Sequence, residues 1–232
     1  MPNAAAPPRR AVVVGAVAAA LFTVILVAVV TDWTPLRSVD LTVSVWGAER
    51  GLAYPWWTPL WVTISLVLGP GAFRIVALGV LLWATISWAV RSRARRTATL
   101  APSRPSADLV VAAAAVLVGG LVPVAVKAIV DRPRPTGALV DALQSSFPSS
   151  HAFAVTAAAG FAIALAAAGS ERVRGVVAVV AVAAVVLVCT ARVALAVHYL
   201  SDVAAGASLG VVWVTVVWSL WRRVSASSDA PA

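Results

Sequence analysis

Three short polar segments interrupt an otherwise apolar chain, and their side chains suit phosphoryl chemistry. The first runs from Lys127 to Arg134, the second ends at His151, and the third runs from Arg192 to Asp202. A transferred phosphoryl group spreads charge over three oxygens, so its site needs cations and hydrogen-bond donors that hold those oxygens. Together the segments supply several cations, two histidines, carboxylates and a pair of serines. This set of residues indicates phosphoryl transfer.

Five of these side chains are predicted to bind phosphate. An arginine can bind two phosphate oxygens at once, and a lysine adds a compact charge. Serines at the start of a helix lie beside free backbone N–H groups, which form an anion site. The predicted phosphate-binding residues are Lys127, Arg134, Arg192, Ser149 and Ser150.

The two histidines of the chain are predicted to have different catalytic roles. His198 lies four residues before Asp202, so the two side chains share a face if the backbone there is helical. The carboxylate can then orient the imidazole, and a neutral imidazole can attack phosphorus. We predict that His198 is the nucleophile and Asp202 its orienting partner. His151 is predicted to protonate the leaving oxygen and later to activate water.

Each feature also has an ordinary explanation when it stands alone. A single histidine near a membrane surface commonly packs at the interface, and paired serines commonly cap a helix. The prediction depends on all three segments lying at one face, in order and with these spacings.

The elements that must position these residues are membrane-spanning helices. The chain has 232 residues, of which 61% are hydrophobic and only 12% are charged. A soluble domain would carry about twice that charged fraction. The net charge of +9 would suit nucleic acid, but the cations lie in short clusters between apolar runs, a pattern typical of membrane topology. We therefore expect the bilayer, and no nucleic acid, as a partner.

Six apolar stretches have the roughly 20 residues that cross a bilayer. They cover residues 11–31, 71–90, 108–130, 151–169, 175–196 and 202–221. A shorter Trp-rich stretch, 56–68, is predicted to be an interfacial helix between the first and second spans. The alternative is that it forms a seventh span, which would reverse the membrane orientation of every later segment. The predicted fold is an all-α integral membrane protein with six transmembrane helices. A single domain over 11–222 is flanked by cytoplasmic tails at 1–10 and 223–232.

The distribution of arginines predicts the orientation of these spans. With a cytoplasmic N-terminus, each inside segment carries two or more arginines, as the positive-inside rule requires. Both termini are then cytoplasmic, and the three polar segments lie at the extracytoplasmic face of a plasma membrane.

The three segments resemble the signature of the type 2 phosphatidic acid phosphatase family, whose pattern vanadate haloperoxidases share. The family's motifs are Lys, six residues and Arg-Pro; Pro-Ser-Gly-His; and Ser-Arg, five residues, His, three residues and Asp. The matching residues are Lys127, Arg134 and Pro135 in the first, Pro148, Ser149 and His151 in the second, and Arg192, His198 and Asp202 in the third. The combined motif is highly specific, and the resemblance covers about residues 56–221.

Two positions depart from the family pattern: Ser150 replaces a glycine, and Ala191 replaces the serine before Arg192. Neither change touches the predicted nucleophile, the general acid or the three cations, so we expect activity to survive. The resemblance implies a six-span helical fold, a phosphohistidine intermediate, and no metal or other cofactor.

The predicted activity is hydrolysis of a lipid phosphate, because Lys127, His151 and His198 lie at span ends, at the depth of lipid headgroups. We favour a polyprenyl pyrophosphate as substrate, by analogy with family members, and then phosphatidic acid or phosphatidylglycerol phosphate. A lipid phosphotransferase with the same nucleophile is an alternative, as is a non-catalytic protein that binds or moves anionic lipids. A soluble haloperoxidase is disfavoured because the spans leave no large soluble domain. The oligomeric state stays open.

Overall fold

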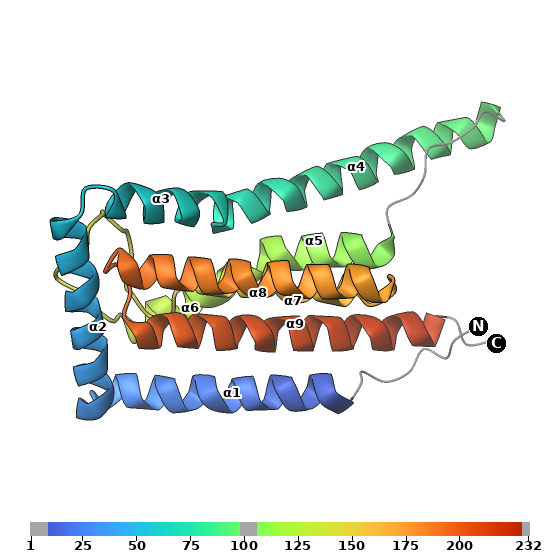
Figure 1. The fold of residues 1–232 in the computed structure, drawn as a ribbon. Helices are drawn as coiled ribbons and strands as arrows, with labels where there is room; N and C mark the ends of the chain where they lie inside the picture. Colours follow the sequence, from blue (N-terminus) through green and yellow to red (C-terminus); the bar gives the residue numbers. More distant parts are fainter. Residues whose placement is uncertain (1–8, 98–105, 229–232) are drawn as a thin grey trace.

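A computed structural model describes residues 9–97 and 106–228 of the chain. Within these residues the secondary structure consists of helices, with no strand. The helices are α1 (Arg9–Val30), α2 (Thr34–Ala53), α3 (Trp57–Val67), α4 (Pro70–Thr97), α5 (Ala107–Gly119), α6 (Leu121–Val130), α7 (Ser150–Ala166), α8 (Glu171–Ala194) and α9 (Leu200–Ser228). Most run side by side in one bundle, and α2 lies across one end of it (Figure 1).

The predicted all-helical membrane fold is confirmed at this level. Five described helical stretches are long and apolar enough to cross a bilayer: Arg9–Val30, Trp57–Ser92, Ala107–Val130, Glu171–Ala194 and Leu200–Ser227. Helix α7 is apolar but shorter. Large aliphatic side chains such as Val24, Ile75 and Val179 point outward from the bundle. Such outward apolar faces are stable against lipid, whereas a soluble protein keeps its exposed apolar patches small.

The Trp-rich segment at 56–68, which we predicted to be a separate interfacial helix, is not confirmed as one. It forms α3, which continues past a break at Gly69 into α4 as one apolar stretch. The helix across the end of the bundle is α2, for which no helix was predicted (Figure 1). The two helices lie differently because their compositions differ. Helix α2 mixes charged residues such as Asp40 and Arg50 with apolar ones, whereas α3 is apolar and packs on α8.

Helices α2 and α3 dock on the C-terminal end of α8. The indole N–H of Trp57 in α3 donates a 2.9 Å hydrogen bond to the carbonyl oxygen of Ala194. In α2, a Cβ added at Gly47 would lie only 2.6 Å from the carbonyl oxygen of Val193, so glycine allows the two backbones to approach closely. These contacts bring α2 and α3 beside the segment that carries Arg192.

Small residues hold α9 against α7. Gly206 and Gly210 are four residues apart and therefore lie on one face of α9. A Cβ at Gly206 would overlap the carbonyl oxygen of Ser149, and one at Gly210 would lie 2.9 Å from that of Phe153. This approach places Asp202, one turn before Gly206, at the start of α7.

The close approach at Gly206 makes a stability prediction. We expect Gly206→Ala to lower the melting temperature of the purified protein, because the added methyl group would meet a backbone oxygen that cannot move aside. The matched control is Gly175→Ala in α8, where a Cβ meets nothing within 4 Å. The control should keep or slightly raise stability, since alanine favours a helix over glycine by about 1 kcal/mol. Equal melting temperatures for both variants, measured by circular dichroism in detergent, would contradict the close packing.

Candidate active site

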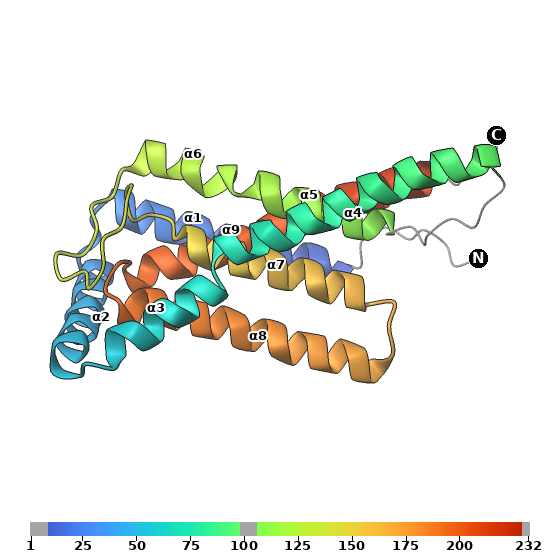
Figure 2. The ribbon, with the colours of Figure 1, turned by 90° about the horizontal axis from the view of Figure 1, so that it is seen from above.

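The predicted site residues gather at the end of the bundle that α2 crosses. The long loop between α6 and α7 folds over this end, next to α2 and to the turn between α8 and α9 (Figure 2). The structure thus brings together three segments that are far apart along the chain.

His198 lies at the centre of this end, with only 2% of its surface exposed. Its Nδ1 lies 3.5 Å from Oδ2 of Asp202, and its Nε2 lies 3.3 Å from Nη1 of Arg134. The first separation is at the outer limit of a hydrogen bond, and Nδ1 has no hydrogen-bond partner within the described part of the chain, so the pair interacts electrostatically. One ring nitrogen therefore faces a carboxylate and the other faces a cation.

The backbone that presents His198 is a turn rather than a helix, because α8 ends at Ala194 and α9 begins at Leu200. Ala196 has a φ of 51°, in the left-handed region that residues other than glycine rarely adopt. The loop between α6 and α7 supports this turn through a 3.0 Å hydrogen bond from the Leu139 N–H to the Leu195 carbonyl. Strained backbone of this kind is often kept at functional sites.

Backbone carbonyl groups orient Arg134. Its Nε donates to Gln144 (3.0 Å), its Nη2 to Leu143 (2.9 Å) and its Nη1 to Val197 (2.6 Å). Burial acts to lower the pKa of Arg134 and the nearby Asp202 carboxylate opposes it, but a guanidinium stays charged. The positive charge is thereby held next to His198.

Lys127 occupies the last turn of α6 and is also buried. Its ammonium donates to the carbonyl oxygens of Ser145 (2.5 Å) and Ser146 (3.2 Å), so it holds the loop that precedes α7. An ammonium has three donors. Within the described residues, two of the three are used.

Arg192, in the last turn of α8, is 7% exposed. Its Nη1 donates a 2.8 Å hydrogen bond to the hydroxyl of Ser65 in α3, while its Nε has no hydrogen-bond partner among the described residues. Sequence reasoning missed Ser65, whose only signal was a serine inside an apolar stretch. Helix α3 therefore contributes to the site.

The second motif forms the start of α7. The Ser149 hydroxyl accepts from the Ala152 N–H at 3.5 Å as the helix cap, and the Ser149 N–H donates to the Asp202 carbonyl at 2.9 Å. Ser149, a predicted phosphate ligand, is buried, and its hydroxyl accepts one structural hydrogen bond. Ser150 and His151 follow as the first, partly exposed residues of the helix. Their backbone N–H groups belong to the first turn, which has no intrahelical acceptors.

Arg132 was not among the predicted site residues, yet it is bound to one of them. Its Nη1 donates to Oδ1 of Asp202 at 2.6 Å and to the Ser201 hydroxyl at 2.8 Å, and its Nη2 donates to Oδ2 of Asp40 at 2.8 Å. Burial acts to lower the pKa of Arg132, but the two carboxylates outweigh it and raise that pKa. The motif Arg-Pro-Arg-Pro drew attention to Arg134, and nothing in the sequence linked Arg132 to Asp40.

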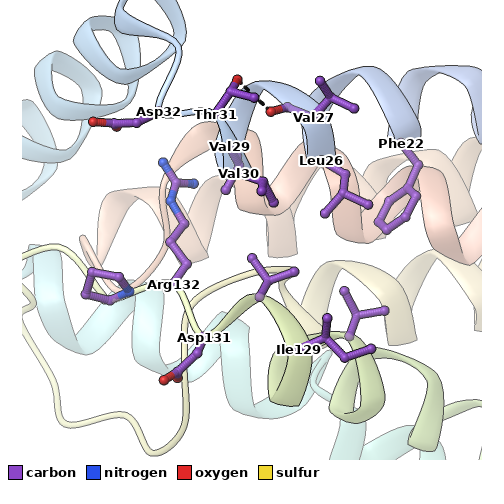
Figure 3. A pocket seen from close by; sticks show the side chains of 13 residues that line it. Phe22, Leu26, Val27, Val29, Val30, Thr31, Asp32, Ile129, Asp131 and Arg132 are labelled. Carbon is purple, nitrogen blue, oxygen red and sulfur yellow. Dashed lines mark hydrogen bonds between the residues drawn. The ribbon is translucent and has the colours of Figure 1, made fainter.

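An apolar cavity of about 750 Å³ lies beside this network, between α1 and α6 (Figure 3). Phe22, Leu26 and Ile129 are among its walls, and Asp131 and Arg132 lie at its polar end.

Comparisons with known proteins identify the family and the fold. Residues 108–225, about half of the chain, match the family model of the PAP2 superfamily. Among solved structures, the fold is similar to one described as the crystal structure of the first transmembrane PAP2 type phosphatidylglycerolphosphate phosphatase from Bacillus subtilis. The TM-score is 0.68 at 20% identity, over 89% of this chain and 96% of that one. A search of curated proteins finds no match. The chain therefore belongs to the PAP2 superfamily, the type 2 phosphatidic acid phosphatases, as a multi-pass membrane lipid phosphatase.

Proposed function

We propose that this phosphatase transfers the phosphoryl group of a lipid to Nε2 of His198 and then to water. The observation that carries the proposal is the orientation of the buried imidazole, with Nδ1 toward Asp202 and Nε2 toward Arg134. Burial lowers the pKa of His198 to about 4, although Asp202 opposes the shift. The imidazole is then neutral near pH 7 and has the lone pair that an attack on phosphorus needs.

The first step forms a bond between Nε2 and phosphorus and breaks the bond from phosphorus to the leaving oxygen. The leaving oxygen takes a proton from the protonated ring of His151, which thereby becomes neutral, and the Asp202 carboxylate stabilises the positive charge that develops on the His198 ring. In the second step, neutral His151 accepts a proton from water, the water oxygen attacks phosphorus, and His198 leaves. The products are inorganic phosphate and an alcohol, or a lipid monophosphate when the substrate is a pyrophosphate.

Three cations bind the phosphate oxygens in this proposal: Lys127, Arg134 and Arg192. Arg134 and Lys127 are already oriented by carbonyl groups, and Arg192 by Ser65. Such preorganised charges lower the barrier because they need not move as the transition state forms. Ser150 and the first N–H groups of α7 supply further donors, and neither a metal nor a cofactor is required.

The lipid part of the substrate is proposed from the surroundings of the site. The bundle around it has an apolar exterior, so the phosphate of a membrane lipid reaches the site while its chain stays in hydrocarbon. We retain polyprenyl pyrophosphate as the favoured substrate, followed by phosphatidic acid and phosphatidylglycerol phosphate. The last of these also fits the description of the similar solved structure.

We further propose six crossings, made by α1, α3 with α4, α5 with α6, α7, α8 and α9. The start of α1 and the end of α9 then lie on the cytoplasmic side of a plasma membrane, and the site lies outside. Both of these helix ends are at the end of the bundle opposite α2 (Figure 1). The inside clusters of arginine support this orientation.

The role of His198 is tested by phosphate release from a panel of lipid mono- and pyrophosphates in detergent. We expect His198→Ala to lower the rate by about 10³-fold or more, as loss of a nucleophile does. Labelled substrate should leave an acid-labile phosphoprotein in the wild type and none in the variant, and a chelator should leave the wild-type rate unchanged. Thr63→Ala, on an exposed face of α3, is the control. Undiminished release by a folded His198→Ala protein would refute the nucleophile and favour a lipid-binding protein.

The ionisation of His198 gives a second prediction. Because burial favours the uncharged ring, its pKa is lowered from 6.5 to about 4, so the folded protein should keep this ring neutral as pH falls from 8 to 5. An unfolded chain takes up the proton near pH 6.5, so this group costs stability as pH falls below that value. We expect constant ¹⁵N shifts of the His198 ring over this range, assigned with His151→Gln. Titration with a midpoint near 6.5 would contradict the burial.

The orientation is tested by cysteine labelling in a Cys189→Ala background, which has no other cysteine. We expect a membrane-impermeant maleimide to label Asp141→Cys, in the loop before α7, on intact cells. Glu171→Cys, at the start of α8, should react only after the cells are permeabilised, although its side chain is 95% exposed. The reverse pattern would invert the proposed orientation.

A further inference from the structure

We propose that Asp40 of α2 is a positioning residue for the catalytic pair. It lies outside the residues that match the family model, which begin at residue 108. In this proposal Asp40 holds Arg132, Arg132 holds Asp202, and Asp202 orients His198. The inference rests on the proposed role of His198 as nucleophile.

The Asp40 carboxylate is 1% exposed and makes three hydrogen bonds with its two oxygens. Oδ1 accepts from the Ser201 N–H at 2.9 Å, and Oδ2 accepts from the Ser201 hydroxyl at 2.5 Å and from Arg132 Nη2 at 2.8 Å. A buried carboxylate is costly unless it is paired, and here every partner belongs to the catalytic end of the bundle. Helix α2 is thus bound to the residue that directly precedes Asp202.

Arg132 transmits this constraint to Asp202. Its guanidinium is planar, so the nitrogen that binds Asp40 and the one that binds Asp202 keep a fixed relative geometry. The ring of Tyr199 lies 4.2 Å from the guanidinium carbon and restrains the plane as well. With Oδ1 of Asp202 held by Arg132, its Oδ2 is directed to the Tyr199 N–H, at 2.9 Å, and to Nδ1 of His198.

The charges of the network explain why a second carboxylate is useful. If Arg132 faced Asp202 alone, the pair would be neutral and would stabilise a positive His198 ring only weakly. Arg132 is instead shared between two carboxylates, which leaves one excess negative charge beside the imidazole. Asp40 therefore keeps Arg132 from neutralising Asp202, and it contributes electrostatically although it does not contact His198.

The docking of α2 keeps Asp40 in place. Gly47, two turns further along α2, lets this helix approach the last turn of α8 at the Val193 carbonyl. The N-terminal part of the chain therefore completes a network whose other members lie in the family-matched region.

The test compares Asp40→Asn with Asp32→Asn. Asparagine keeps the size of the side chain but removes its charge, so we expect kcat for lipid phosphate to fall by about tenfold, the scale of one buried charge-assisted hydrogen bond. KM should stay unchanged, because the three phosphate-binding cations are not touched. Asp32 forms an exposed ion pair with Arg37, and its variant should keep the wild-type kcat. A wild-type kcat for Asp40→Asn would overturn the proposal.

A double-mutant cycle separates positioning from general stabilisation. In an Asp202→Asn background, Asp40→Asn should cause little further loss of kcat, because its effect passes through Asp202. The same fractional loss in both backgrounds would show a merely structural role and refute the proposal. If Asp40→Asn does not fold, Ser201→Ala, which removes one hydroxyl contact of Asp40, is tested in the same cycle with the same criterion.

A spectroscopic measurement does not depend on turnover. We expect Asp40→Asn to shift the ¹⁵N resonance of His198 Nδ1, and Asp32→Asn to leave it unchanged. Failure of the wild type to release phosphate from any lipid would refute the proposed function. The Nδ1 resonance would still report whether Asp40 affects His198 through Arg132 and Asp202. An unchanged Nδ1 resonance in Asp40→Asn would refute the positioning role.

Discussion

A carboxylate buried completely among apolar helices, that of Asp202, is the constraint on which the rest of the site depends. Each of its polar groups is bound to a different segment. Oδ1 accepts from Arg132, Oδ2 accepts from the Tyr199 N–H and faces His198, and the backbone carbonyl accepts from Ser149. Satisfying one buried charge thus brings α7, the loop before it and the turn after α8 to one place.

The cations of the site are stabilised in a different way. Lys127 and Arg134 donate to backbone carbonyl groups, and Arg192 donates to a hydroxyl, so these hydrogen bonds leave their positive charges uncancelled. The negative charges lie on the other side of His198, on Asp202 and, through Arg132, on Asp40. This separation of charge across one imidazole suits a reaction in which a dianion approaches Nε2 while positive charge develops on the ring.

The membrane environment shapes how the helices reach this arrangement. Burial of apolar surface does not drive helices together in hydrocarbon, so close backbone contacts at small residues are important. Gly206 lets α9 approach α7 beside Asp202, and Gly47 lets α2 approach α8 beside Arg192. These glycines therefore allow close contact between helices that carry site residues.

The sequence by itself determined the helical membrane fold, the family, and a set of site residues that the structure brings to one end of the bundle. Apolar stretches and motif spacings are local patterns, so they can be read without knowing how the helices pack. The sequence did not predict the crosswise helix α2, because its interrupted polarity resembles neither a span nor a regular amphipathic helix. Only the tertiary structure decided that the Ser149 N–H donates to the Asp202 carbonyl. It also decided that Ser65 supports Arg192 across 127 residues and that Asp40 pairs with Arg132 across 92. A hydrogen bond between residues so far apart leaves no periodic trace, because its partners become neighbours only when the helices pack.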